Sequence, residues 1–171
     1  MKRLARCLWL CGCLAVWGLL FSTAATAGVL QLNPLVSVDS HGQLSMLRDP
    51  EGQLSADEAA AAPGWKALPG AVNAGFTRDA VWIRLEVQRP ADAPQQRWLA
   101  QFRNALLDDV RLYRRDDTGR WQLAVHSGED IGREHWPVDA RNVQLPLTLE
   151  STEPTPLLLR LQSRNAMSTT I

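Results

Sequence analysis

The residues of this sequence best suited to chemistry are aromatic rings and guanidinium groups. Trp82 and Arg84 are separated by one residue within an apolar segment, so an extended chain would place both on the same side. A flat ring beside a planar guanidinium can stack on a sugar ring or hold a carboxylate. Trp136, Arg141 and Arg160 are weaker candidates for the same kind of site. The sequence therefore predicts binding of a small polar ligand or a carbohydrate.

Trp82 and Arg84 also have a structural interpretation, which we favour. Large aromatic residues are mostly buried in folded proteins. Trp82 would then be covered by residues 29–76, and Arg84 would pair with an acid such as Asp49 or Glu86.

The three weaker candidates have structural alternatives as well. Trp136 stands beside Pro137 in a predicted loop, where it would be either the lid of a pocket or a packed plug. For Arg141 and Arg160, a salt bridge at the surface is the simpler role.

Catalytic machinery is hard to assemble from the remaining residues. The three histidines lack the spacing of metal ligands such as H-E-x-x-H and are more typical of surface or turn positions. The carboxylates of Asp108-Asp109 would point to opposite faces of a strand, and those of Asp116-Asp117 would cap a turn. There is no G-x-S-x-G elbow and no phosphate-binding glycine loop. We predict a binding domain that is not an enzyme and that has no metal or cofactor.

The first 27 residues have the three parts of an export signal. Three basic residues precede an almost wholly apolar run over residues 7–21, and Ala25-Thr26-Ala27 fits a signal peptidase site. The alternative to a cleaved signal is an uncleaved membrane anchor. A membrane span needs about 20 apolar residues, and this run is shorter, so we prefer cleavage before Gly28. All three cysteines lie in this segment, which leaves the exported chain without a thiol.

The exported part, residues 28–171, is predicted to form one periplasmic domain. Without the three basic residues of the signal, 15 of the 18 Arg and Lys residues remain against 18 Asp and Glu, a net charge of about −3. This charge gives no electrostatic footprint for nucleic acid.

Short segments that alternate between apolar and polar residues predict antiparallel strands. In Ala80 to Gln88, Val81, Ile83, Leu85 and Val87 form the core face. The same pattern predicts strands over residues 43–48, 98–104, 110–115, 121–125, 142–149 and 157–163, and the turn at 116–119 makes a hairpin of two of them.

A single short helix is expected among these strands. Ser55 and Glu58 form a capping box ahead of four alanines, and Pro63-Gly64 ends the helix. Together these elements predict an all-β fold, an antiparallel β-sandwich for which a jelly roll fits best. Ser168 to Ile171 resembles only the beginning of a strand, so we expect the fold to be truncated before its last strand.

The order of several short motifs resembles a known family over about residues 36–171. The motifs are Leu47-Arg48-Asp49, Gly52, Leu54-Ser55, Trp65, Phe76, Trp82-Ile83-Arg84-Leu85, Trp98-Leu99, residues 107–113, Gly119, Ser127-Gly128, Arg141 and residues 159–163. They resemble the type 2 extracellular domain of bacterial seven-transmembrane receptors with diverse intracellular signalling modules (7TMR-DISM).

This resemblance implies a jelly roll similar to carbohydrate-binding modules, tethered outside the inner membrane. Seven membrane helices and a cytoplasmic diguanylate cyclase or histidine kinase would follow, so the attached membrane domain would be a partner. Two other functions stay open: a secreted carbohydrate-binding or accessory module, and a structural domain that forms homodimers.

Overall fold

The computed structural model describes residues 28–171. The predicted export signal lies outside the described residues. Within the described range, no helix is long and apolar enough to cross a membrane.

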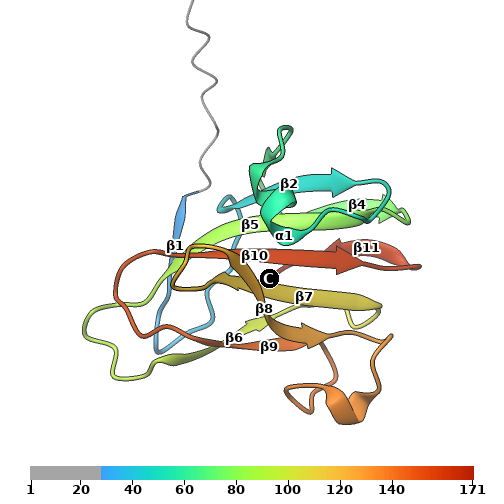
Figure 1. Ribbon diagram of the computed structural model, residues 1–171. Coiled ribbons are helices and arrows are strands. Elements are labelled where there is room, and N and C mark those ends of the chain that lie inside the picture. Colours follow the sequence, from blue (N-terminus) through green and yellow to red (C-terminus); the bar gives the residue numbers. More distant parts are fainter. Residues whose placement is uncertain (1–27) are drawn as a thin grey trace, which may run out of the picture.

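The larger of two layers is a seven-stranded sheet in the order β3-β2-β5-β10-β7-β8, with β1 beside β5 (Figure 1). Neighbouring strands along this order are antiparallel, whereas β1 runs parallel to β5. The strands are β1 (Val29–Gln31), β2 (Leu44–Asp49), β3 (Lys66–Leu68), β5 (Ala80–Gln88), β7 (Asp109–Arg115), β8 (Trp121–Ser127) and β10 (Thr155–Gln162).

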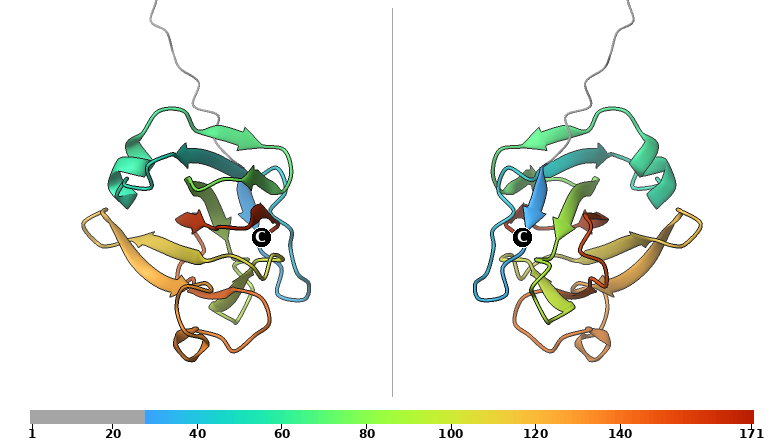
Figure 2. Two further views of the ribbon diagram at one scale, coloured as in Figure 1. Left: turned by 90° about the vertical axis from the view of Figure 1, so that its right-hand side faces the viewer. Right: turned by 90° about the vertical axis from the view of Figure 1, so that its left-hand side faces the viewer.

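The second layer consists of two pairs of antiparallel strands. They are β4 (Val72–Phe76) with β11 (Ala166–Thr169), and β6 (Arg97–Gln101) with β9 (Gln144–Thr148). A backbone hydrogen bond of 3.2 Å from Arg103 N to Thr170 O joins the two pairs. Figure 2 shows this layer facing the large sheet, with helix α1 (Ala56–Ala61) outside both.

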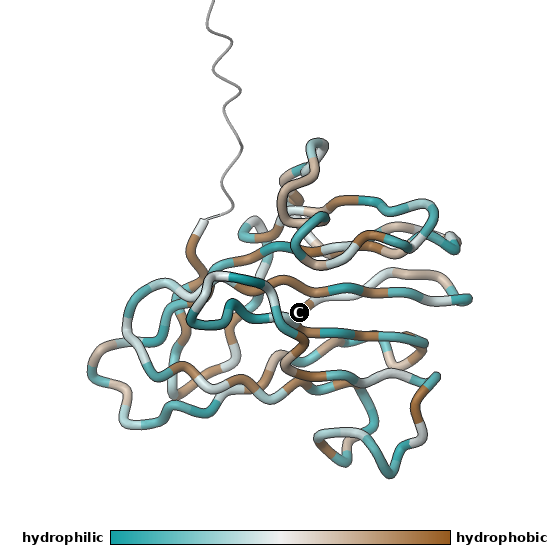
Figure 3. The backbone as a smooth tube through the Cα atoms, viewed as in Figure 1, coloured by the Kyte–Doolittle hydropathy of each residue, from teal (hydrophilic) through white to brown (hydrophobic). Residues whose placement is uncertain are grey.

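The core fills the space between the layers. Apolar and polar residues alternate along the strands (Figure 3), so each sheet turns one apolar face inward. The large sheet contributes the predicted row of β5 together with residues of β10 and β7, and the second layer adds residues of β6, β9 and β11. The predicted all-β antiparallel sandwich is confirmed.

The individual elements also agree with the sequence patterns. β5 has the predicted bounds, β7 and β8 form the predicted hairpin, and Val81, Ile83, Leu85 and Val87 are buried. The strand suggested by Ser168 to Ile171 is β11, which begins earlier, at Ala166, and pairs with β4. The expected truncation of the domain stays a prediction.

Helix α1 begins with the predicted capping box. Glu58 N donates to Ser55 Oγ (3.3 Å), and Ser55 N donates to Glu58 Oε2 (2.9 Å). The hydrogen bond from the Ser55 side chain lowers the pKa of Glu58. Because the pKa is lower in the folded chain, this stabilisation is complete above the unfolded pKa and is lost as the pH falls through the folded one.

We expect Ser55→Ala to lower the free energy of unfolding by about 1 kcal/mol, because loss of the cap leaves the backbone N–H of Glu58 without its side-chain acceptor. Urea unfolding at neutral pH measures the change. Ser37→Ala, at an exposed position outside any helix or strand, is the control and should leave stability unchanged. A variant of Ser55 as stable as this control would show that α1 is held by packing alone.

Candidate functional site

The outer face of the large sheet, turned away from the core, carries a row of side chains across five strands. Trp82 of β5 lies opposite Leu47 of β2 and Arg160 of β10. Arg160 is in turn opposite Arg111 of β7, and Arg111 is opposite His126 of β8. The row therefore places two predicted site residues of β5 and β10 beside two residues of the β7–β8 hairpin that were not predicted.

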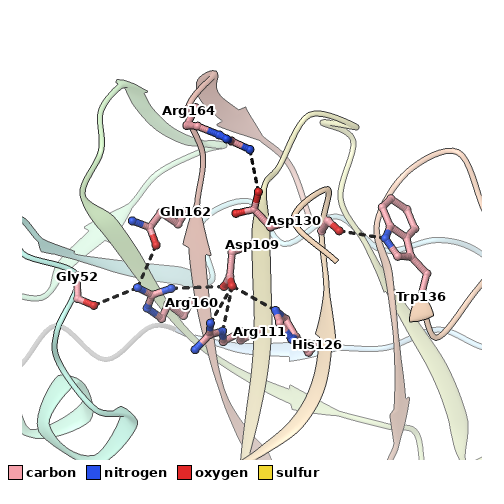
Figure 4. Close-up of polar contacts among 10 residues, drawn as sticks. Gly52, Asp109, Arg111, His126, Asp130, Trp136, Arg160, Gln162 and Arg164 are labelled. Carbon is pink, nitrogen blue, oxygen red and sulfur yellow. Dashed lines mark hydrogen bonds and ion pairs between the residues drawn. The ribbon is translucent and has the colours of Figure 1, made fainter. Parts of the chain in front are cut away.

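Asp109 is the centre of an ionic cluster at one end of this row (Figure 4). Its Oδ2 accepts hydrogen bonds from Arg111 Nη2 (2.9 Å) and Nε (3.1 Å) and lies 3.2 Å from His126 Nε2. Its Oδ1 is 3.4 Å from Arg160 Nη1. Asp109 is only 8% exposed, so one shielded carboxylate contacts the side chains of Arg111, His126 and Arg160 from three strands.

Arg160 forms a salt bridge with Asp109, but this pair is buried. The prediction of a salt bridge at the surface is therefore wrong. The residue is 8% exposed, and a charge at such a depth is tolerated when it is paired and hydrogen-bonded. Besides Asp109, its guanidinium donates to Gly52 O and to Gln162 Oε1, both at 3.1 Å. Arg160 thereby ties the turn before α1 to β10 and β7.

Asp49 secures the other side of this turn. Its carboxylate accepts hydrogen bonds from the backbone N–H groups of Gly52 (2.9 Å) and Leu54 (3.0 Å) and from Trp82 Nε1 (3.4 Å). Gly52 has a φ of 66°, a conformation that glycine adopts without strain. Asp49 is thus a structural residue of the turn and does not pair with Arg84 as the sequence suggested.

Trp82 is fully buried, which corrects its assignment as an aromatic platform for ligands. It belongs to a second apolar cluster on the outer face that includes Leu47, Ala59, Trp121 and Leu158. Its ring centroid is 5.6 Å from that of Tyr113. Because the ring has no exposed surface, it cannot stack on a ligand in this conformation. The alternative of a Trp82 covered by the segment that includes β2 and α1 is the one observed.

Arg84 does lie at the surface of this face, beside an aromatic ring. Its guanidinium carbon is 4.6 Å from the ring centroid of Trp65, which is half-buried and donates its indole N–H to Ala59 O (3.1 Å). Among residues 28–171, Arg84 has no carboxylate partner. The predicted pairing with Asp49 or Glu86 is therefore wrong, and a cation–π contact takes its place.

Arg111 is the most accessible cation of the Asp109 cluster. Partial burial acts to lower the pKa of its guanidinium, but the hydrogen bond and charge of Asp109, with a contribution from Tyr113, outweigh this effect and raise the pKa. With its side chain 36% exposed, Arg111 can bind Asp109 and still present N–H groups to solvent.

Trp136 and Arg141 lie in the loop between β8 and β9, apart from the Asp109 cluster. Trp136 is buried against the core, and its indole N–H donates to Gly128 O (3.0 Å, Figure 4). The guanidinium of Arg133 covers the ring at 4.5 Å. Trp136 is thus the packed plug of the two predicted alternatives. Arg141 is exposed, and its carbonyl accepts a hydrogen bond from Arg133.

Asp108 lies just before β7 and binds partners different from those of Asp109. It accepts hydrogen bonds from the backbone N–H and from Nε of Arg164, and Arg164 also pairs with Asp130 at 2.7 Å (Figure 4). These acids raise the pKa of Arg164. The two carboxylates therefore serve separate ion pairs and do not face one reacting bond.

The described residues contain no grouping of three His, Cys, Asp or Glu side chains that could hold a metal ion. His41 and His135 are exposed beside Asp39 and Glu134, respectively. His126 lies on β8 within the Asp109 cluster, and its side chain is 33% exposed, so it is a surface position on a strand.

The residues of this face that were not predicted as site residues are Trp65, Asp109, Arg111 and His126. Asp109 stands two residues before Arg111 on a strand, and this spacing could have indicated an ion pair on one face. Trp65 lies in a connection outside any strand, where no periodicity indicates which way a side chain points.

Comparison with known proteins identifies similarity at the level of the whole domain. The model of the family described as 7TMR-DISM extracellular 2 matches residues 41–171. No curated protein matches the chain. The matched region includes every strand from β2 to β11 and all residues of the Asp109 cluster.

Proposed function

This chain belongs to the 7TMR-DISM extracellular 2 family, and we propose that it is the ligand-binding input of a bacterial signalling protein. A domain of this family is an extracellular sensor domain of a membrane receptor and is not itself catalytic. In this proposal the domain binds a small polar ligand or a carbohydrate, and the binding site is on the outer face of the large sheet.

One observation carries the choice of site. Arg84 stacks on Trp65 at 4.6 Å and has no acidic partner among the described residues. A guanidinium that is held against a ring and has no carboxylate partner can donate hydrogen bonds to an anionic or hydroxyl-rich ligand. Because the side chain is already held in place, it loses little conformational freedom on binding. Arg111, on the same face and partly exposed, supplies a second set of donors. The aromatic ring beside Arg84 is also what supports a carbohydrate among the candidate ligands.

The Asp109 cluster supports a route by which binding could reach the rest of the protein. Asp109 holds Arg111 of β7 and Arg160 of β10, and Arg160 holds the turn at Gly52. A ligand that competes with Asp109 for Arg111 would favour a different arrangement of these segments. The attached membrane domain, and a diguanylate cyclase or histidine kinase behind it, would respond to that arrangement.

We expect Arg84→Ala to weaken ligand binding by at least about tenfold, because a charged hydrogen-bond donor is removed. Glycan-array screening and calorimetric titration with small organic acids and saccharides provide the measurement. Arg141→Ala, in the loop away from β5, is the matched control and should retain wild-type affinity. Trp82→Phe should retain it as well, because the ring is buried.

Equal affinities of the Arg84 and Arg141 variants would remove the outer face as the binding site. The secreted-module alternative is distinguished by the reading frame beyond Ile171, which the receptor proposal expects to encode seven apolar spans. The structural alternative expects homodimers in light scattering and no ligand.

A further inference from the structure

Ser45 of β2 carries a buried hydroxyl that no other group of the described chain satisfies. The residue is 0% exposed, and its Oγ forms no hydrogen bond within residues 28–171. A buried hydroxyl without a partner costs free energy, and most such groups in folded proteins are therefore paired. The Ser45 hydroxyl is thus available to a hydrogen-bond partner that the chain itself does not supply.

The strand register places this hydroxyl at the site proposed above. Ser45 lies directly opposite Arg84 in the antiparallel pair of β2 and β5. Directly opposite residues of an antiparallel pair point to the same face, with Cβ atoms about 5 Å apart. On its other side Ser45 is opposite Ala67 of β3, whose side chain is only a methyl group. Arg84 is therefore the long side chain that flanks the hydroxyl in this row.

Arg84 adds a positive charge and further donors at the same place. Its guanidinium carbon lies 4.6 Å from the ring centroid of Trp65, and it forms no ion pair with any acid of residues 28–171. A guanidinium has five N–H donors in a rigid fork that matches the two oxygens of a carboxylate. Two kinds of donor thus lie side by side, and no carboxylate of the described chain binds either of them.

Glu86 limits the charge that a ligand can bring to this site. It is the next residue of β5 that points to the outer face after Arg84, and it is half-buried. One arginine beside one acid suits a ligand with a single negative charge. The dianion of a phosphate monoester would be repelled more strongly by Glu86. The charges on this face therefore favour a carboxylate over a phosphate.

We propose that the outer-face site selects a carboxylate, which binds the guanidinium of Arg84 and the hydroxyl of Ser45 together. This inference rests on the proposed function, which places a small polar ligand at Arg84, and it names the chemical class of that ligand. One oxygen of the carboxylate accepts hydrogen bonds from Arg84, and the other accepts from Ser45 Oγ. Because Ser45 is covered, the stem of the Arg84 side chain turns aside on binding while its guanidinium stays against Trp65.

Glucuronate and glucose test the charge at nearly constant shape, because they differ only in the carboxylate at C6. In calorimetric titrations of the purified chain, glucuronate should bind at least about tenfold more tightly than glucose, since its hydrogen bonds to Arg84 are charge-assisted. Phenylacetate and phenylacetamide repeat the comparison on a body without sugar hydroxyls. The same preference for the charged member is expected in both pairs.

Ser45→Ala separates the hydroxyl from the rest of the site. It should weaken the binding of both carboxylates by about tenfold and leave the two neutral probes unchanged. Ser127→Ala is the matched control: Ser127 is also 0% exposed with an unpaired hydroxyl, but it lies on β8 opposite the core residue Val110. This control should keep the full preference for carboxylates.

Urea unfolding of the Ser45 variant distinguishes ligand binding from a structural role. Because the hydroxyl is unpaired in the free protein, its removal should not lower the free energy of unfolding. A structural hydroxyl would instead lower stability and weaken all four probes together.

Three results would overturn the carboxylate site. They are neutral probes that bind as tightly as their charged partners, a folded Ser45→Ala variant that keeps the full preference for carboxylates, and failure of both carboxylates to bind. The proposed function fails separately, through its own comparison of the Arg84 and Arg141 variants. A saccharide that binds through Arg84 without preference for the charged form would leave the proposed function intact and overturn this inference alone.

Discussion

Replacing Asp109 with asparagine should lower the free energy of unfolding by about 3–5 kcal/mol, which is the usual effect of removing one partner of a buried ion pair. Arg160 would keep its charge at 8% exposure and lose its only carboxylate among the described residues. Arg111 and His126 would lose the same anchor. Urea unfolding followed by circular dichroism measures the loss.

Asp117→Asn is the matched control for this substitution. It makes the same chemical change at an exposed turn position and should alter stability by less than about 0.5 kcal/mol. If the Asp109 variant behaved like this control, the cluster would not hold β7, β8 and β10 together, and the route proposed for signalling would lose its structural basis.

A double-mutant cycle separates the ion pair from the rest of the cluster. Arg160→Met removes the buried cation, so adding Asp109→Asn should then cost clearly less than it does in the wild-type chain. We expect a coupling free energy of about 1–3 kcal/mol. Additive effects would show that Asp109 acts mainly through Arg111 and His126.

The sequence predicts the fold well because its strongest signal is local. Alternation with a period of two is a property of each strand by itself, and it places Val81, Ile83, Leu85 and Val87 on the core face without knowledge of any partner strand. The capping box of α1 is equally local, since Ser55 and Glu58 are three residues apart.

The candidate site depends on strand register, which such patterns do not contain. Arg160 and Asp109 are 51 residues apart and meet because β10 pairs with both β5 and β7. A shift of one residue in this register would turn Arg160 toward the core. The contact between Arg84 and Trp65 depends in addition on the path of a connection with no periodicity.

The position of Trp82 depends both on alternation within β5 and on contacts with distant segments. Alternation correctly separates it from the core row of β5, but an outer face can carry an apolar cluster of its own. The turn from Asp49 to Leu54, held by the Asp49 carboxylate, brings α1 over the ring. Trp121 of β8, whose backbone N–H donates to Asp57 of α1 at 3.2 Å, belongs to the same cluster.

We therefore expect Trp82→Ala to lower the free energy of unfolding by about 3–5 kcal/mol, because it leaves a cavity beneath α1. Trp82→Phe should have a smaller effect, since a ring still fills much of the space. Phe76→Ala is the control: this aromatic side chain is 86% exposed and its removal should leave stability nearly unchanged. Urea unfolding of the three variants tests the order.

The opposite outcome would restore Trp82 as a ligand contact. If Trp82→Ala were as stable as Phe76→Ala and lost affinity in the titrations, the ring would have to be accessible in solution. The cluster of Leu47, Ala59, Trp121 and Leu158 would then open and close over it. With the expected outcome, the cluster instead fixes α1 and the neighbouring Trp65 ring, so that Arg84 is presented in one orientation. Ligand affinity would then depend on Trp82 only through the stability of this support.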